Sequence, residues 1–469
     1  MVQLHGGTWK RAGILGGLVA VCAAVVVGTA LSPFVTALAF VGLIAVGATL
    51  AFPTTGVFLM VALFLIQGSP VYTSYGVFSQ GATASDAVGG LVLASLIIGM
   101  AQGRCDPVAR LRGRAGLAVV AVWVYFLWAA LSVMWSQADS ATLSQSVRND
   151  IEMASFFTLM VMTLVDARGV RQAAATYAIV GTGLALYVIA VFHSQGGFNS
   201  VAPNIQAYRG GLAQDLNADE LGAILAVVPG FAYIALEGVK QARRLLLTLA
   251  SIPAIGVAVI IVDSRQVLLS VALAIAAIVV FTRGYQARAA AAPIALLGGL
   301  TLIILVNTGH LPWYFQNRFQ STDISTLNLR LPIWQVGWQD FVQHPITGVG
   351  AEQLEASLPS YIAVGSAQSD FVRALADFGL IGFMALLAML SVLGRIVLFQ
   401  SRRHPAAIGI AVILLSSMVA GSMIKEHWMM PSLGIITCFG LLYPRLGDHL
   451  ASENVRPGSG PLVVGDISP

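Results

Sequence analysis

The sequence predicts an all-α, polytopic integral membrane protein with about fourteen transmembrane helices and a large outer-face loop that contains short amphipathic helices. Apolar residues make up 57% of the 469 residues, and charged residues only 10%, whereas a soluble domain carries about 25%. The mean hydropathy is +0.83. A chain this poor in charge needs lipid as its main solvent. Its long unbroken apolar runs indicate helices, because a helix satisfies its own backbone hydrogen bonds inside the bilayer.

The apolar runs are long enough, or nearly long enough, to cross a membrane as helices of ~20 residues. In chain order they are 12–31, 35–51, 55–67, 85–102, 115–135, 149–165, 172–193, 217–236, 245–262, 266–282, 290–306, 377–398, 405–422 and 431–444. The runs 55–67 and 431–444 are short for a span and fit one only if it is tilted, broken or longer than drawn. The first run has no convincing cleavage site after it, so we interpret it as a retained helix and not as a signal peptide.

These runs divide the chain into four parts. Residues 1–306 hold transmembrane helices 1–11, residues 307–376 form a large loop, residues 377–450 hold helices 12–14, and residues 451–469 form a disordered cytoplasmic tail. A smaller loop covers 194–216. Long loops in a compact protein usually carry its function, so the two loops are where we expect a site.

Positive charge predicts the orientation, with both termini in the cytoplasm. Eighteen of the 25 Lys and Arg residues then lie in inner loops, where they favour anionic lipid and give no indication of nucleic-acid binding. Seven remain outside: Arg148, Arg209, Arg265, Arg318, Arg330, Arg373 and Lys425. Each is expected to have an anionic partner. In the simplest interpretation the partner is a carboxylate of the protein, and in the alternative it is the phosphate of a lipid or ligand.

Three of these arginines lie in segments that suit an anion. Arg209 precedes two glycines, which let a backbone approach a ligand closely. Arg265 begins the helix after a tight turn, and a helix N-terminus favours an anion. Arg330 precedes Pro332, which is predicted to lie in the first turn of an interfacial helix over 332–343. One face of that helix would carry Trp334, Trp338, Phe341 and Val342.

Four segments together resemble one family. RLPIWQVGWQDFVQHPITGVGAEQLEA resembles the signature "sR..iW…hP..GvG" of the O-antigen ligase/polymerase superfamily, and AQSDFVRALADFGLIGF is similar to its "HN.yL.ll.e.GliGl". YRGGLAQDLNADELG resembles the upstream "R..G…N.lg" motif, and DSRQVLLS the "SR…la" motif. The four follow the family's order over about 200–400.

The resemblance implies a metal-independent, inverting, GT-C-like glycosyltransferase without cofactors in the bacterial inner membrane, with a periplasmic active site. Donor and acceptor would be undecaprenyl-pyrophosphate-linked glycans, and a chain-length regulator and a flippase are possible protein partners. Arg209 and Arg265 match family arginines that hold the donor pyrophosphate, and Arg330 is expected to join them. Their positive charge would stabilise the leaving group. The absence of a DxD motif agrees with a leaving group that needs no metal.

The chain departs from the family where "HN" falls on Gln368 and Ser369. The histidine is the presumed general base of the ligase branch, and glutamine accepts no proton near neutral pH. This favours a Wzy-type polymerase, which makes O-antigen, capsule or exopolysaccharide, with Asp370 as a candidate base. The other interpretation of Asp370 is an ion-pair partner of Arg373 on the same helix.

The remaining predicted site residues are candidates for substrate binding: Arg318, Arg373, His344, Gln368, Tyr361 and Trp334. His344 also fits a role in shaping the turn of HPITGVG, in which Gly348 and Gly350 are expected to make a tight bend. The aromatic residues fit anchoring at the membrane interface as well as stacking on sugars. Asp377 is expected at the start of a span, where a helix N-terminus stabilises an acid.

Two other functions fit parts of the sequence. An O-antigen ligase would transfer the glycan to lipid A core, and only the missing histidine argues against it. A transporter or flippase for lipid-linked oligosaccharide would place ionisable residues near the bilayer midplane. The middles of the predicted spans are almost free of charge, which favours an enzyme.

Overall fold

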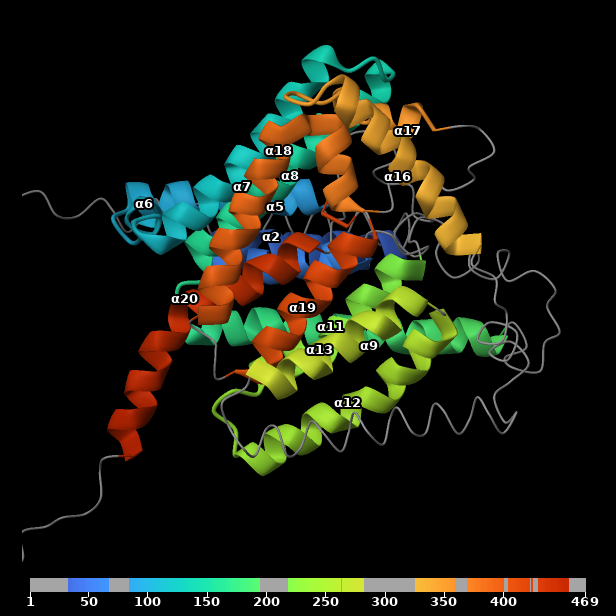
Figure 1. The fold of residues 1–469 in the computed structure, drawn as a ribbon. Helices are drawn as coiled ribbons and strands as arrows, with labels where there is room; N and C mark the ends of the chain where they lie inside the picture. Colours follow the sequence, from blue (N-terminus) through green and yellow to red (C-terminus); the bar gives the residue numbers. More distant parts are fainter. Residues whose placement is uncertain are drawn as a thin grey trace, which may run out of the picture.

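The described part of the protein is helical and contains no strand, which confirms the predicted all-α class for these residues (Figure 1). The structure is a computed structural model, and the residues it describes are 33–66, 84–194, 218–262, 264–281, 325–358, 369–399, 404–421, 423–424 and 429–454.

The helices of the first half are α2 (Pro33–Ala51), α3 (Pro53–Ile66), α5 (Ala84–Ala101), α6 (Pro107–Arg110), α7 (Arg114–Leu131), the 3-10 turn η1 (Ser132–Trp135), α8 (Ser140–Thr163) and α9 (Ala167–Ser194). Those of the second half are α11 (Ala218–Ala235), α12 (Gln241–Val262), α13 (Arg265–Phe281), α16 (Ser325–Gln343), α17 (Gln353–Ala356), α18 (Asp370–Gly394), the π-helical turn η3 (Arg395–Phe399), α19 (Pro405–Ala420) and α20 (Met429–Asn454).

Five helices of the described part are long and apolar enough to cross a membrane: Ala84–Ala101, Arg114–Trp135, Ala167–Ser194, Arg243–Val262 and Asp370–Leu398. Shorter apolar helices accompany them, among them α3 and α19. A polytopic membrane protein fits this set, while the number fourteen stays a prediction. The predicted runs 12–31 and 290–306 lie outside the described residues.

Several helices have other bounds than the apolar runs suggest. α8 begins at Ser140 and not at 149, because the Asp139 carboxylate accepts the N–H groups of Ala141 (3.1 Å) and Thr142 (3.0 Å) and caps a polar first turn. α20 continues to Asn454, which is beyond its apolar run and four residues into the predicted tail.

The two helices of the predicted site also start early. α16 begins at Ser325, so Pro332 lies inside this helix. The prediction that Pro332 lies in the first turn is wrong. α18 begins at Asp370, seven residues before the predicted span, and has a non-helical residue, Gly379, with φ 64°. Polar helical turns thus precede the apolar part of each segment, where hydropathy alone gives no signal.

Helix ends gather in two polar layers at opposite ends of the bundle. At one end the side chains of Arg148 (α8) and Asp86 (α5) form an ion pair. At the other, Arg171 Nη1 donates to the Glu237 carbonyl (2.7 Å) and Arg244 Nη2 lies 2.9 Å from His404 Nε2. We call the first the outer end and the second the inner end, because the charge pattern predicts that the first faces the periplasm.

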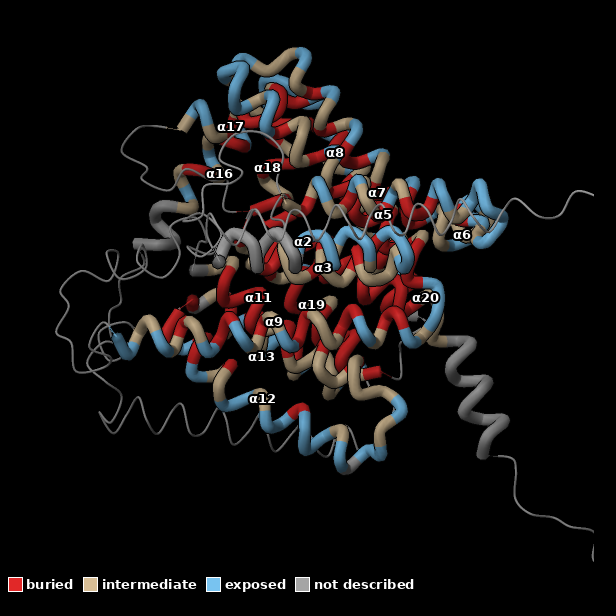
Figure 2. The backbone as a smooth tube through the Cα atoms, turned by 180° about the vertical axis from the view of Figure 1, so that it is seen from behind, coloured by how far each residue is buried: buried red, intermediate tan, exposed pale blue. Residues whose placement is uncertain are grey.

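The core lies between these layers. Tyr125, Phe156, Tyr177 and Phe231 are fully or almost fully buried among neighbouring helices. Figure 2 shows buried residues along the middle of the bundle and exposed ones along its outer helix faces. Many exposed residues on these faces are large and apolar, such as Ile179, which is 72% exposed. Such faces suit contact with lipid.

Candidate functional site

A break in α18 holds the HPITGVG segment at the outer end. A helix break frees backbone groups that need new partners. Here the partners come from 345–350. The hydrogen bonds are Val349 N–H to the Ala376 carbonyl (3.0 Å), Gly350 N–H to the Asp377 carbonyl (2.9 Å) and Leu380 N–H to the Pro345 carbonyl (2.9 Å). The indole N–H of Trp128 donates to the Phe378 carbonyl (3.0 Å), which ties α7 to the same break.

Glycine is required on both sides of this contact. Gly348 (φ 71°) and Gly350 (φ 103°) adopt the left-handed region, which confirms the predicted tight bend. A Cβ atom at Gly350 would lie 2.6 Å from the Cα of Ser136, and one at Gly379 would lie 2.6 Å from the carbonyl carbon of Ile346. The motif glycines therefore allow two backbones to touch, and the segment is built into the helix bundle.

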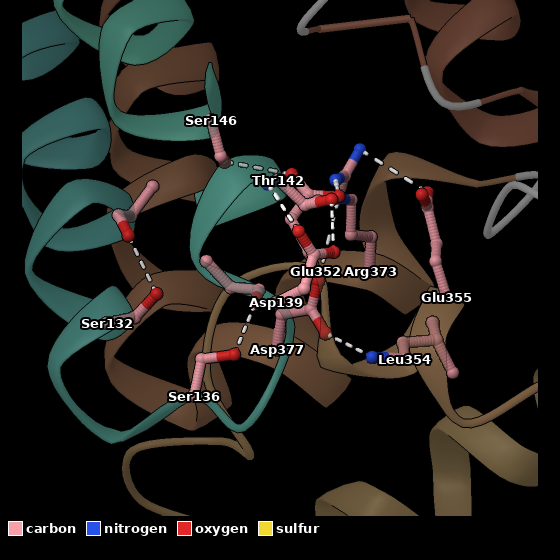
Figure 3. A network of polar contacts seen from close by, with 12 residues as sticks. Ser132, Ser136, Asp139, Thr142, Ser146, Glu352, Leu354, Glu355, Arg373 and Asp377 are labelled. Atoms are coloured by element: carbon pink, nitrogen blue, oxygen red, sulfur yellow. Dashed lines mark hydrogen bonds and ion pairs between the residues drawn. The ribbon is translucent and has the colours of Figure 1, made fainter. Parts of the chain in front are cut away.

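Arg373 lies at the centre of a buried ion network beside this bend (Figure 3). Its Nη2 is 2.6 Å from Glu352 Oε2, its Nη1 is 3.7 Å from Glu355 Oε1, and its Nε is 3.5 Å from Asp377 Oδ2. The guanidinium side chain is only 6% exposed. Three carboxylates thus surround one buried cation, and the contact of Arg373 with substrate stays a prediction.

The same network is fastened to the rest of the bundle. The Ser146 hydroxyl of α8 donates to Glu352 Oε1 (2.8 Å), and the Leu354 N–H donates to Asp377 Oδ1 (2.9 Å). Glu352 has a φ of 61°, which is unusual for a residue with a side chain. α18 begins at Asp370 and Asp377 is fully buried inside it, so the predicted position of Asp377 at a helix N-terminus is wrong.

Asp370 joins α18 to the chain that follows α19. Its Oδ2 accepts the N–H groups of Met423 (2.9 Å) and Ile424 (3.0 Å), and its own N–H donates to the Gly421 carbonyl (3.2 Å). The side chain is almost completely buried. Its carboxylate therefore has a structural role, and its role as a base stays a prediction.

Arg330 connects three elements that are far apart in sequence. Its Nη2 lies 3.8 Å from Asp219 Oδ2 on α11 and 3.4 Å from Gln266 Oε1 on α13. The Ser264 hydroxyl donates to Asp219, which joins the first turns of these two helices. Arg265 is the first residue of α13, beside Gln266, and its side chain lies outside the described part. The segment that contains Arg209 ends where α11 begins.

This cluster can attract an anion. The N-termini of α11 and α13 carry partial positive charge, and Arg330 adds a full charge whose side chain is 20% exposed. The first turn of α11 also carries the acids Asp219 and Glu220, which offset this charge, and Asp219 holds the guanidinium in place. The arrangement suits a phosphate group that approaches from the outer end.

The other predicted residues are spread more widely. His344 is exposed at the end of α16, and its N–H donates to the Asp340 carbonyl (3.0 Å). Burial raises the pKa of the Asp340 carboxyl, and the nearby His344 partly offsets this. Trp334 is half-buried, while Trp338 is 59% exposed, as an interfacial helix face would be. Arg209, Arg318, Tyr361 and Gln368 lie outside the described residues.

The structure adds residues that sequence reasoning did not select. Asp219, Gln266 and Glu352 each contact a predicted arginine. Gln266 directly follows Arg265, and Asp219 lies ten residues after Arg209, so both were inside recognised motifs. The sequence did not indicate that Arg330 contacts Asp219 and Gln266, because these contacts depend on how α11, α13 and α16 pack together.

Residues 249–387 match the family described as "O-Antigen ligase" (Wzy_C). The matched segment runs from α12 into α18 and includes Arg330, Asp370 and Arg373. The predicted resemblance to this family is therefore confirmed for residues 249–387. No curated protein matches the chain.

Proposed function

We propose that this chain, whose segment from α12 into α18 belongs to the O-antigen ligase family, polymerises undecaprenyl-pyrophosphate-linked repeat units into a long polysaccharide. The reaction would take place at the periplasmic face of the inner membrane. The observation that carries this proposal is the contact of Arg330, which lies in the family segment, with the first turns of α11 and α13. This contact brings together Asp219, which lies ten residues after Arg209, and Gln266, which directly follows Arg265.

In this proposal the donor pyrophosphate binds beside Arg330, with Arg265 and Arg209 as further contacts. A hydroxyl of the acceptor sugar attacks the anomeric carbon, and the bond from this carbon to the pyrophosphate oxygen breaks. The leaving group then gains negative charge, which the guanidinium groups and the helix N-termini stabilise. Binding both glycans in one site supplies the orientation.

We assign acceptance of the hydroxyl proton to Asp370. It begins α18 and binds the chain directly after α19, and the last turns of α19 accept a hydrogen bond from Gln266 Nε2 of α13 at the Ser417 carbonyl (3.3 Å). Asp370→Asn keeps an oxygen that accepts the N–H groups of Met423 and Ile424 but removes the negative charge. We expect this variant to fold and to lose chain extension.

The ion network of Arg373 supports the proposal in another way. It fixes the segment 352–355 against α18 and α8 through buried contacts. A rigid outer segment keeps the reacting groups in place, which matters because small misplacements reduce rates strongly. We therefore assign positioning of the outer segment to Arg373.

The test of the site uses purified protein and a polyprenyl-pyrophosphate-linked repeat unit, with products sized on a gel. Arg330→Gln should reduce chain extension by about 10²-fold, as expected when one stabilising donor of the leaving group is removed. Arg148→Gln is the matched control, because Arg148 forms an ion pair at the same end but between α5 and α8. Equal activity of the Arg330 variant and the wild type would refute the pyrophosphate site.

The class of reaction is tested in cells by deleting the gene and sizing the surface glycan. Single repeat units without long chains support a polymerase. Long lipid-linked chains that never reach a carrier indicate the ligase instead. Repeat units held at the inner face indicate a flippase.

A further inference from the structure

A second feature of the molecule lies at the inner end, away from the proposed reaction site. A cavity of about 800 Å³ opens between the start of α7 and the end of α18. Its lining includes Arg114, Leu117, Leu390, Ser391, Arg395 and Leu398. A second cavity of about 540 Å³ shares Arg114 and continues the lining to Arg110, Arg112 and the apolar side chains of α20. Basic residues thus meet apolar walls in both.

The position of the first cavity relative to the membrane follows from the two helices that form it. α7 and α18 pack against each other and belong to the candidate spans Arg114–Trp135 and Asp370–Leu398. α7 starts where α18 ends, so Arg114 and Arg395 lie at the same membrane surface. Leu117 (55% exposed) and Leu398 (42% exposed) continue the lining toward the lipid. The cavity thus has charged side chains at the membrane surface and an apolar wall beside them. This arrangement matches a lipid headgroup and its acyl chain.

The backbone at Arg395 is fixed. Residues 395–399 form a π-helical turn, a feature that is rare and is often found at functional sites. α20 approaches this turn so closely that a Cβ atom at Gly440 would lie 2.8 Å from the Ile396 carbonyl oxygen. Gly440 therefore allows close packing that holds the turn. Arg395 itself is exposed. Within the described residues it forms no ion pair with a carboxylate.

We propose that this cavity binds an anionic phospholipid of the cytoplasmic leaflet, with its phosphate between Arg114 and Arg395 and one acyl chain along Leu117 and Leu398. Two guanidinium groups provide forked donors for phosphate oxygens. A zwitterionic lipid already carries a cation beside its phosphate, so this pair of arginines suits an anionic lipid better. The inference depends on the membrane-spanning helices α7 and α18 and is independent of the proposed glycosyltransferase activity.

The test measures lipid bound to the purified full-length protein by native mass spectrometry, after equal exposure to phosphatidylglycerol or phosphatidylcholine. We expect the wild type to retain phosphatidylglycerol at least fivefold more than phosphatidylcholine. Arg114→Gln/Arg395→Gln should lose this preference. Arg168→Gln is the matched control, because Arg168 is also exposed at the inner end but does not line the cavity. It should retain the wild-type preference.

A second variant distinguishes the contribution of the cavity to lipid binding from that of the two arginine charges. Ser391 is exposed and lines the cavity, so Ser391→Trp should fill the space and displace the lipid while both arginines remain. Inorganic phosphate at about 10 mM should not compete if the ligand is a lipid, and competition by phosphate would overturn the lipid assignment. The proposal also fails if the double arginine variant binds like the Arg168 variant, if Ser391→Trp binds like the wild type, or if undecaprenyl phosphate is preferred to phosphatidylglycerol.

Discussion

Replacement of Arg373 by methionine should destabilise the protein strongly. Methionine keeps most of the side-chain length but removes the guanidinium, which is only 6% exposed. The change leaves the carboxylates of Glu352 and Asp377, with side chains 11% and 0% exposed, without their cation. Removing one partner of a buried ion pair leaves a buried charge that the protein must neutralise or expose.

The expected cost is about 3–5 kcal/mol, the usual range for breaking a buried ion pair from one side. The hydrogen bonds from Ser146 to Glu352 and from the Leu354 N–H to Asp377 remain, so the cost should not reach the sum of three separate ion pairs. At about 2 °C of melting temperature per kcal/mol for a large chain, the loss corresponds to about 6–10 °C.

The assay is the thermal unfolding of the purified protein in detergent. Arg148→Met is the matched control, because Arg148 forms an ion pair with Asp86 in which the two side chains are 30% and 26% exposed. Loss of such a pair costs about 1 kcal/mol or less. Adding Glu352→Gln to the Arg373 variant should restore about 1–2 kcal/mol, because it removes one of the orphaned charges.

The result that refutes this reasoning is an Arg373→Met protein that unfolds at the wild-type temperature. If that protein also lost chain extension, Arg373 would be a substrate contact and not the centre of a structural network. A cost equal in the Arg373 and Arg148 variants would show that burial of the network contributes nothing.

Two further predictions concern other parts of the structure. Gly379→Ala should cost about 1–3 kcal/mol of unfolding free energy, because φ is 64° and the new Cβ would press on backbone atoms of Ile346. Gly90→Ala is the control: a Cβ there would have no atom within 4 Å, so the variant should be neutral or slightly stabilising. Equal melting temperatures of the two variants would contradict this prediction. At the inner end, burial and then the nearby Arg244 lower the pKa of His404 to about 3. The unfolded chain binds this proton below about pH 6.5 while the folded protein does not, so stability should fall by about 2 kcal/mol from pH 7 to pH 5. His404→Gln should flatten that part of the pH profile of the melting temperature, and an unchanged slope would show that His404 is not its source.

Much of the fold was available from the sequence. The apolar runs predicted helices such as α5, α7 and α9 to within a few residues, because a chain in lipid must satisfy its backbone internally. Helix starts were harder. The first turns of α8 and α18 are polar and are set by a cap and by a docked segment, which hydropathy does not detect.

The family motifs were also readable, and the resemblance that they carry holds for residues 249–387. Their physical roles differ from motif to motif. The bend at Gly348 and Gly350 follows from glycine chemistry and was predicted from the residues alone. The partner of that bend, the broken turn at Gly379, was not, because a glycine inside an apolar helix gives no sign of what approaches it.

By itself the sequence determined that this chain is helical, that its apolar helices suit a membrane, and that it carries arginines in family motifs. Only the tertiary structure decided which arginine is enclosed by carboxylates and which reaches across helix ends. Arg373 has Asp370 and Asp377 within four residues in the sequence, and Arg330 has no acid within six. In the structure Arg373 is buried among three carboxylates, two of them from the segment 352–355, while Arg330 joins α11 to α13. The physical reason is that the sequence gives the position of each arginine, whereas helix packing determines which residues lie beside it. Asp219, the partner of Arg330, lies 111 residues away in the sequence.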